Sequence, residues 1–113
     1  MNDCLFCKII KGEIPSTKVY ENNYVYAFMD IDPQAPFHAI IVPKIHIKSA
    51  DEINAENSIY IAKIFEAVAE IAKAEKLENG YRVVNNCGED GGQTVGHIHF
   101  HLLARRNLQW PPG

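Results

Sequence analysis

One stretch decides the fold: Gly96-His97-Ile98-His99-Phe100-His101-Leu102-Leu103. Histidines occupy every second position, and apolar residues fill the gaps between them. Strict alternation of this kind predicts a β-strand with two different faces. Because side chains at i, i+2 and i+4 of a strand project the same way, we expect one face to enter the core. The other face then presents three imidazoles in a row.

The three histidines cannot all share one role. A rise of ~3.3 Å per residue places His97 and His101 roughly 13 Å apart on a strand. A tetrahedral zinc ion with bonds near ~2.1 Å therefore binds at most two of the three. At least one histidine is left for nucleophilic or acid–base chemistry, which suits a side chain that titrates near neutral pH. The alternative is a row of ordinary half-buried polar residues.

Length and charge narrow the class of protein. A chain of 113 residues predicts one domain, residues 1–113, with a single core. The first residues lack a basic stretch before an apolar run, and no apolar run approaches the ~20 residues of a membrane span, so we expect a cytoplasmic protein that does not enter membranes. A formal net charge of −3 with scattered basic residues argues against extended nucleic-acid binding.

An odd number of cysteines argues against a disulfide framework. Cys4 and Cys7 lie at i and i+3 on a short helix predicted for about residues 4–11, with Asp3 as its cap and Gly12 at its end. Such a pair supplies half of a tetrahedral zinc site. A redox motif and two inert buried thiols are the alternatives.

The remaining pattern predicts strands, one long helix and further strands. Strands are expected at residues 19–21, 24–29, 37–43 and 81–85. Apolar residues at helical spacing predict the long helix at about residues 55–76, capped by Asn54 and ended by Asn79-Gly80. This order is typical of an α+β domain with an antiparallel sheet.

Two loops and the tail are candidates for binding. Residues 88–94 are rich in glycine and lead into the histidine stretch, which favours a phosphate loop over an ordinary hairpin connection. Residues 30–36 are either a plain connection or a rim that places Asp30 near a sugar hydroxyl. Trp110-Pro111-Pro112-Gly113 is too stiff and apolar for a frayed end and suggests docking onto a surface.

Together these motifs resemble the histidine triad (HIT) family, and within it the Hint branch of nucleotide-binding phosphoramidases. The resemblance covers essentially the whole chain. Besides the alternating histidines, it rests on Phe6-Cys7-Lys8-Ile9-Ile10, Asp30-Ile31, Pro33-Gln34-Ala35-Pro36, His38, Pro43-Lys44, His46, Gly91-Gly92-Gln93 and Trp110-Pro111-Pro112-Gly113. It implies a five-stranded antiparallel sheet with a short N-terminal helix and one long helix. Two copies are expected to pair into a homodimer with a ten-stranded sheet.

The resemblance also implies an activity. Family members bind purine nucleoside monophosphates and hydrolyse P–N or mixed-anhydride bonds at the α-phosphate through a nucleotidyl-histidine intermediate. One alternative is hydrolysis of dinucleoside polyphosphates, as in another HIT branch, but the Trp-Pro-Pro-Gly ending favours the Hint branch. A second is a zinc-stabilised nucleotide-binding scaffold. An intact His99 together with Gln93 and a glycine-rich loop argues against the scaffold.

Residue roles follow from the same resemblance. His99 is the expected nucleophile, His101 contacts the phosphate, and His38 supports the histidine row. Thr94 is expected to assist catalysis, although a serine is common at its position, and Gln93 to bind phosphate and leaving group beside it. The further expected nucleotide-binding residues are Leu5, Phe6, Ile9, Phe28, Asp30, Ile31, Asn86, Gly92 and Trp110, of which Trp110 is expected to reach the partner subunit.

Some family members with paired cysteines bind a structural zinc ion. The matching ligands are Cys4, Cys7, His46 and His97, a Cys₂His₂ set, so one zinc ion per chain is expected. A zinc-bound His97 cannot protonate the leaving group, which leaves Thr94, His101 or water for that task. The chain departs from the family where Ala104-Arg105-Arg106 replaces the usual Gly-Gly-Arg.

Overall fold

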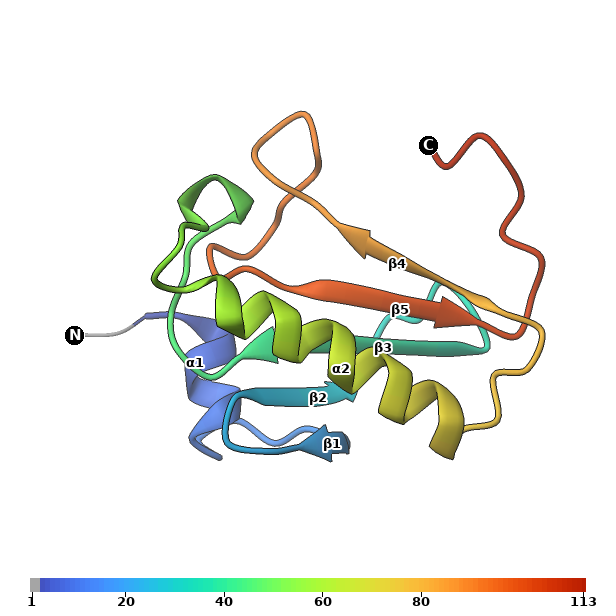
Figure 1. Ribbon diagram of the computed structural model, residues 1–113, viewed down its shortest axis with the longest axis horizontal. Coiled ribbons are helices and arrows are strands. Elements are labelled where there is room, and N and C mark those ends of the chain that lie inside the picture. The colour runs from blue at the N-terminus through green and yellow to red at the C-terminus, as the bar shows by residue number, and fades with distance from the viewer. Residues whose placement is uncertain (1–2) are drawn as a thin grey trace.

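The computed structural model describes residues 3–113, which form a five-stranded antiparallel sheet with the strand order β1-β2-β3-β5-β4 (Figure 1). The strands are β1 (Lys18–Glu21), β2 (Val25–Met29), β3 (Phe37–Pro43), β4 (Tyr81–Asn85) and β5 (Phe100–Ala104). A short helix α1 (Leu5–Ile10), a 3₁₀ turn η1 (Ala50–Glu52) and a long helix α2 (Ser58–Ala74) complete the described chain. The predicted sheet with one short and one long helix is confirmed.

The two helices cover opposite faces of the sheet. Helix α2 runs across the sheet in Figure 1, and its residues Ile64 and Ile71 pack in the main core. A smaller cluster forms on the other face, where Phe6 and Ile9 of α1 pack against Phe28 of β2. Burial of these apolar surfaces is the main stabilising contribution to a sheet of this size.

The alternation in the histidine stretch holds, although the strand begins later than predicted. Ile98, Phe100 and Leu102 are buried in the α2-side core, as expected. Strand β5 starts at Phe100 rather than near Gly96, so the prediction of one strand carrying all three histidines was wrong. The reason is a contact with a distant segment: the Ile98 N–H donates to the carbonyl of Ile47, which follows β3, at 2.6 Å.

The N-cap residue of helix α1 is a cysteine. The expected cap was Asp3, but the N-cap is Cys4, whose Sγ accepts a hydrogen bond from the N–H of Cys7 at 3.3 Å. The helix ends at Ile10, and Gly12 follows with a φ of 79°, a left-handed conformation that favours glycine. The predicted end of this helix is therefore confirmed to within one residue, and the predicted cap was wrong.

Helix α2 is shorter than predicted at both ends. Its first residue is Ser58 rather than residue 55, because the Asn54 side chain accepts the N–H groups of Glu56 and Asn57 at 2.8 and 3.1 Å. These bonds form a turn that delays the helix. At the other end the helix stops at Ala74. Lys76, the predicted last residue, has a left-handed φ of 56° and lies four residues before Gly80.

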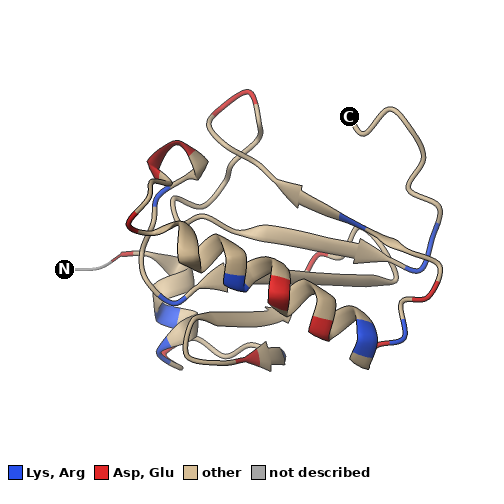
Figure 2. Cartoon of the chain, in the orientation of Figure 1, with Lys and Arg blue, Asp and Glu red and all other residues tan. Residues whose placement is uncertain are grey.

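Charged residues of both signs lie along α2 and in the loops (Figure 2). On α2, Lys63 and Glu66 form an ion pair at 3.1 Å, one helical turn apart. Within residues 3–113, neither helix has the length and apolar character required to cross a membrane.

Candidate functional site

A pocket of about 300 Å³ opens on the α1 face of the sheet. Its walls come from α1, the turn before β1, the end of β2, β3 and the segment that runs into β5. A volume of this order is at the lower end for small-molecule sites. It brings together nine predicted nucleotide-binding residues: Leu5, Phe6, Ile9, Phe28, Asp30, Ile31, Thr94, His99 and His101.

Sequence reasoning missed part of the wall. The unassigned lining residues are Ile14, Pro15, Ser16, Met29, Ile40 and Val95. Alternation from His38 places Ile40 on the same face of β3, so this residue could have been found. The turn that holds Ser16 carries no comparable pattern. The Ser16 hydroxyl lies 2.8 Å from the Tyr26 hydroxyl, a contact that forms only in the folded chain and that local sequence does not predict.

His99 has its two ring nitrogens in different environments. Its Nδ1–H donates to the carbonyl of His97 at 2.8 Å, and the imidazole is only 4% exposed. Burial lowers the pKa of His99, so the ring is neutral at neutral pH. Because Nδ1 holds the proton, Nε2 carries a lone pair on a ring that lines the pocket. This is the protonation state required of a nucleophile.

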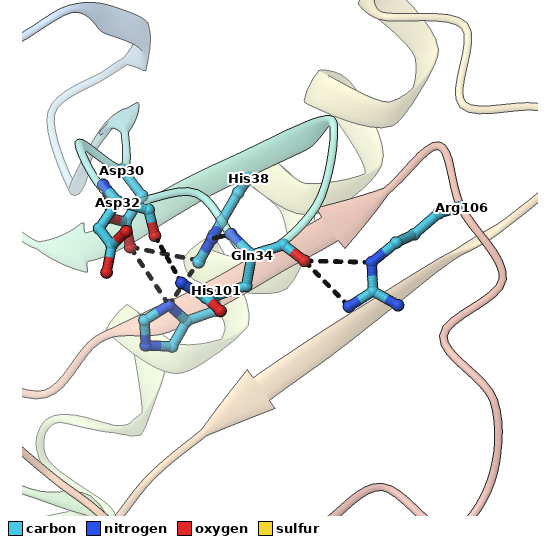
Figure 3. A network of polar contacts seen from close by, with 6 residues as sticks. All are labelled: Asp30, Asp32, Gln34, His38, His101 and Arg106. Carbon is cyan, nitrogen blue, oxygen red and sulfur yellow. Dashed lines mark hydrogen bonds and ion pairs between the residues drawn. The ribbon is translucent and has the colours of Figure 1, made fainter.

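His38 and His101 are joined by a hydrogen bond that fixes both tautomers (Figure 3). The backbone N–H of Gln34 donates to His38 Nδ1 at 3.0 Å, so this nitrogen bears no proton. The His38 proton is therefore on Nε2 and points at His101 Nδ1, 2.8 Å away. His101 consequently carries its proton on Nε2. Burial, assisted by His99 and His38, lowers the pKa of His101 to about 4.

Asp30 lies beside this histidine pair. Its Oδ2 is 3.3 Å from His38 Nε2 and 4.0 Å from His101 Nδ1, and its Oδ1 accepts the Asp32 N–H at 2.8 Å. The carboxylate favours the charged form of His38, but burial has the larger effect and lowers the pKa of His38. These three side chains have the donor types of a metal site. The His38–His101 hydrogen bond already uses two of the three donor atoms.

A second cluster gathers four potential metal ligands. The Sγ atoms of Cys4 and Cys7 and one ring nitrogen each of His46 and His97 all lie within 4.8 Å of one another. Cys4 Sγ lies 3.3 Å from His97 Nδ1, and Cys7 Sγ lies 3.4 Å from His46 Nδ1. Tetrahedral zinc requires sulfur and nitrogen ligands to be roughly 3.6 Å apart, given bonds of ~2.3 and ~2.1 Å.

The surroundings of this cluster fit a cation. His97 Nε2–H donates to the carbonyl of Pro43 at 3.0 Å, which turns the Nδ1 lone pair toward the sulfurs, as metal-bound histidines are commonly held. Burial lowers the pKa of His97 to about 4, so the ring is neutral. Burial also raises the pKa of the Cys4 thiol, and a bound cation would offset that effect.

Gln93 holds the glycine-rich loop by backbone contacts. Its Nε2 donates to the carbonyls of Lys48 and Val95 at 2.8 and 3.0 Å, and its Oε1 accepts the N–H of Gly88 at 3.0 Å. Asn86, Gly92, Gln93 and Trp110 are the predicted nucleotide-binding residues that do not line the pocket. Asn85, the other candidate beside the chosen Asn86, donates through its side-chain amide to the His99 carbonyl at 2.9 Å.

The tail is fixed at its start and exposed at its end. The Arg82 guanidinium of β4 donates to the carbonyls of Leu108 and Gln109. Trp110 follows and is 80% exposed. The Trp110 indole does not line the pocket.

Comparison with known proteins agrees with this geometry. The HIT domain family matches residues 11–108. The chain belongs to the HIT family. A HIT family hydrolase from Legionella pneumophila Philadelphia 1 superimposes with a TM-score of 0.95 at 50% identity, covering 98% of this chain and 100% of the other. The predicted family membership is confirmed.

Two curated HIT relatives are informative. A 14 kDa zinc-binding protein from Zea mays is 50% identical over 117 residues, covering 96% of this chain and 87% of that protein. A purine nucleoside phosphoramidase from Escherichia coli K12 is 44% identical over 107 residues, covering 94% of this chain and 90% of that protein. Both similarities span more than nine tenths of this chain.

The glycine-rich loop of this HIT domain offers a test of its packing. A Cβ atom at Gly91 would lie 2.5 Å from the carbonyl oxygen of Cys87 and 2.8 Å from its nitrogen. Backbone atoms cannot rotate away, so we expect Gly91→Ala to lower the free energy of unfolding by about 1–3 kcal/mol. Gly96→Ala is the matched control, because nothing lies within 4 Å of a Cβ there. Urea denaturation measures both, and equal losses would contradict the packing described.

Proposed function

We propose that the chain hydrolyses P–N or mixed-anhydride bonds at the α-phosphate of purine nucleoside monophosphates, through a nucleotidyl intermediate on His99. The observation that carries the proposal is the bare Nε2 of His99, on a neutral ring anchored through Nδ1 to the His97 carbonyl. The similarity to a purine nucleoside phosphoramidase, 44% identical, supports the same substrate class.

The reaction divides into two displacements at phosphorus. In the first, the Nε2 lone pair of His99 forms a bond to the α-phosphorus while the bond from phosphorus to the leaving amine breaks. The amine leaves with that electron pair and gains a proton. In the second, water attacks the phosphorus, the phosphorus–Nε2 bond breaks, and the nucleoside monophosphate leaves as the proton from water is released. Each displacement is easier than the direct one because imidazole is both a good nucleophile and a good leaving group.

Neighbouring groups have distinct tasks in this scheme. The Nε2–H of His101, held in that tautomer by His38, donates to a phosphate oxygen as negative charge develops. The His99 Nδ1–H bond to the His97 carbonyl stabilises the positive ring of the intermediate. Thr94 lines the pocket and delivers the proton to the amine, directly or through water. His97 is excluded from that role because its only proton is used on Pro43.

The remaining pocket walls match a nucleoside. Phe6, Ile9 and Phe28 supply an apolar surface for the purine ring. Asp30 also lines the pocket, and its carboxylate would accept hydrogen bonds from ribose hydroxyls. Gln93 does not line the pocket, but its amide holds the loop that leads to Thr94, which would lie on the phosphate side. Asn86 lies in the same loop.

We also infer that Cys4, Cys7, His46 and His97 hold one structural zinc ion per chain. The donor set and the spacing of sulfur and nitrogen atoms support this, as does similarity to a 14 kDa zinc-binding protein. When bound, the ion contributes folding free energy by joining three separate segments. His97 then anchors the carbonyl that holds His99.

A homodimer is part of the proposal. Strand β4 is at one edge of the sheet and leaves backbone groups for pairing with a second copy, which would give ten strands. Tyr81 on this strand is 44% exposed and Trp110 is 80% exposed. Pairing at this edge would cover both aromatic rings and bring Trp110 toward the partner subunit.

The nucleophile is tested with His99→Ala. We expect kcat for adenosine 5′-phosphoramidate to fall at least ~10³-fold, because the attacking nitrogen is lost. The affinity for AMP, measured by calorimetry, should change less than about tenfold, because the pocket walls remain. Retained turnover in this variant would remove the proposal, as would a preference of the native protein for a diadenosine polyphosphate.

The metal site is tested with two serine variants. Elemental analysis of protein purified without added zinc should find about one zinc ion per chain. Cys7→Ser removes a ligand and should lose the metal, whereas Cys87→Ser changes a cysteine outside the cluster and should retain it. Native protein without zinc, with Cys4 and Cys7 freely titratable in the folded state, would contradict the assignment.

A further inference from the structure

Arg106 lies outside the pocket, yet its guanidinium is connected to the His38–His101 pair. Its Nε and Nη2 donate to the carbonyl of Gln34 at 3.1 and 2.9 Å, so two donors hold one oxygen (Figure 3). The side chain is exposed at the start of the tail, directly after β5. The two residues lie 72 positions apart in the sequence.

Gln34 transmits this contact to the histidines. Its carbonyl is held by Arg106, and its own N–H donates to His38 Nδ1 at 3.0 Å. Within the loop, the Asp32 N–H donates to Asp30 Oδ1 at 2.8 Å and Gln34 Nε2 donates to the Asp32 carbonyl at 3.0 Å, whereas Pro33 and Pro36 have no N–H group to donate. The Arg106 fork supplies an anchor from outside the loop.

The Gln34 N–H and Asp30 Oδ2, which lies 3.3 Å from His38 Nε2, both favour one of two proton arrangements. With the N–H in place, His38 is protonated on Nε2, and His101 is protonated on Nε2. If the N–H moves away, the His38 proton can transfer to Nδ1. Its bare Nε2 then faces His101 Nδ1, which draws the His101 proton to Nδ1. His101 would present a lone pair, not a donor, on its Nε2.

We propose that Arg106 is a positioning residue that holds Gln34, and through it His38, so that His101 keeps its Nε2–H as a donor. This inference rests on the proposed function for its effect on the rate, because the donor serves the phosphate there. The tautomer itself does not depend on any activity. Arg106 touches neither the pocket nor the reacting atoms, so it is not a catalytic residue.

The neighbouring arginine provides a matched control. Arg105 is also exposed and also donates to a carbonyl, that of Glu75, at 2.9 Å, with Glu75 Oε1 at 3.3 Å. Its guanidinium lies over the ring of Phe37 and makes no hydrogen bond to residues 30–36. Arg105→Met therefore removes the same charge from the adjacent position and leaves the Gln34 anchor intact.

The experiment compares Arg106→Met, Arg106→Lys and Arg105→Met in the metal-loaded full chain. Long-range proton–nitrogen NMR spectra report which ring nitrogen is protonated in His38 and His101. Steady-state hydrolysis of adenosine 5′-phosphoramidate gives kcat and KM. The Nδ1-protonated state of His99 serves as an internal control of folding, because the His97 carbonyl holds it independently of Gln34.

In the native protein we expect His38 and His101 to be protonated on Nε2. Arg106→Met should give mixed tautomers for both rings and a kcat about tenfold lower, less than the ~10²–10⁴-fold of a whole acid–base group. The tautomer mixture and kcat of Arg106→Lys should lie between those of the native protein and Arg106→Met, since a single ammonium replaces the two-donor guanidinium. Arg105→Met should match the native protein in both readouts. KM should change less than about twofold.

Native tautomers in Arg106→Met would overturn the inference, whatever the rate. A fall in kcat that is equal in Arg105→Met and Arg106→Met would overturn it as well, because that result indicates a loss of charge only. If the native protein does not hydrolyse the phosphoramidate, the proposed function fails. The nitrogen spectra of the variants then decide the tautomer inference alone.

Discussion

The arrangement of the site depends on the hydrogen bond between His99 Nδ1–H and the His97 carbonyl. It ties the proposed nucleophile to a residue whose own ring is fixed by Pro43 and faces two thiols. Alternation along the stretch makes this possible, because Ile98 lies between the two histidines and is buried in the core on the opposite face. Structural support and chemistry thus come from adjacent residues of one segment.

Burial explains why four histidines are available as neutral rings. Desolvation lowers the pKa of His38, His97, His99 and His101, and each has a hydrogen-bond partner that determines which nitrogen is protonated. Two charged rings so close together would repel each other. In the proposed scheme, neutral rings with defined tautomers would provide one lone pair for attack, one donor for phosphate and one lone pair for metal.

Local pattern was enough to predict an antiparallel α+β sheet and the two faces of the histidine stretch. The number of strands and the assignment of His46 and His97 to a metal cluster came from the family resemblance. The features that neither predicted depend on contacts between distant residues. The late start of β5 arises from the Ile98–Ile47 bond, and the Gln93 amide reaches Lys48, 45 positions away. The Cys4 N-cap of α1 was also not predicted, because aspartate is a usual N-cap residue and Asp3 precedes the helix. Residue roles in the pocket rested on family resemblance and stay predictions.

The stereochemical course at phosphorus tests the central claim most directly. A nucleotide phosphoramidate made chiral at its α-phosphorus with oxygen isotopes or sulfur would be hydrolysed in isotopically labelled water. Two successive in-line displacements, with His99 Nε2 as the first nucleophile, predict overall retention of configuration in the released nucleotide. Overall inversion would show a single direct attack by water and would contradict the nucleotidyl-histidine account.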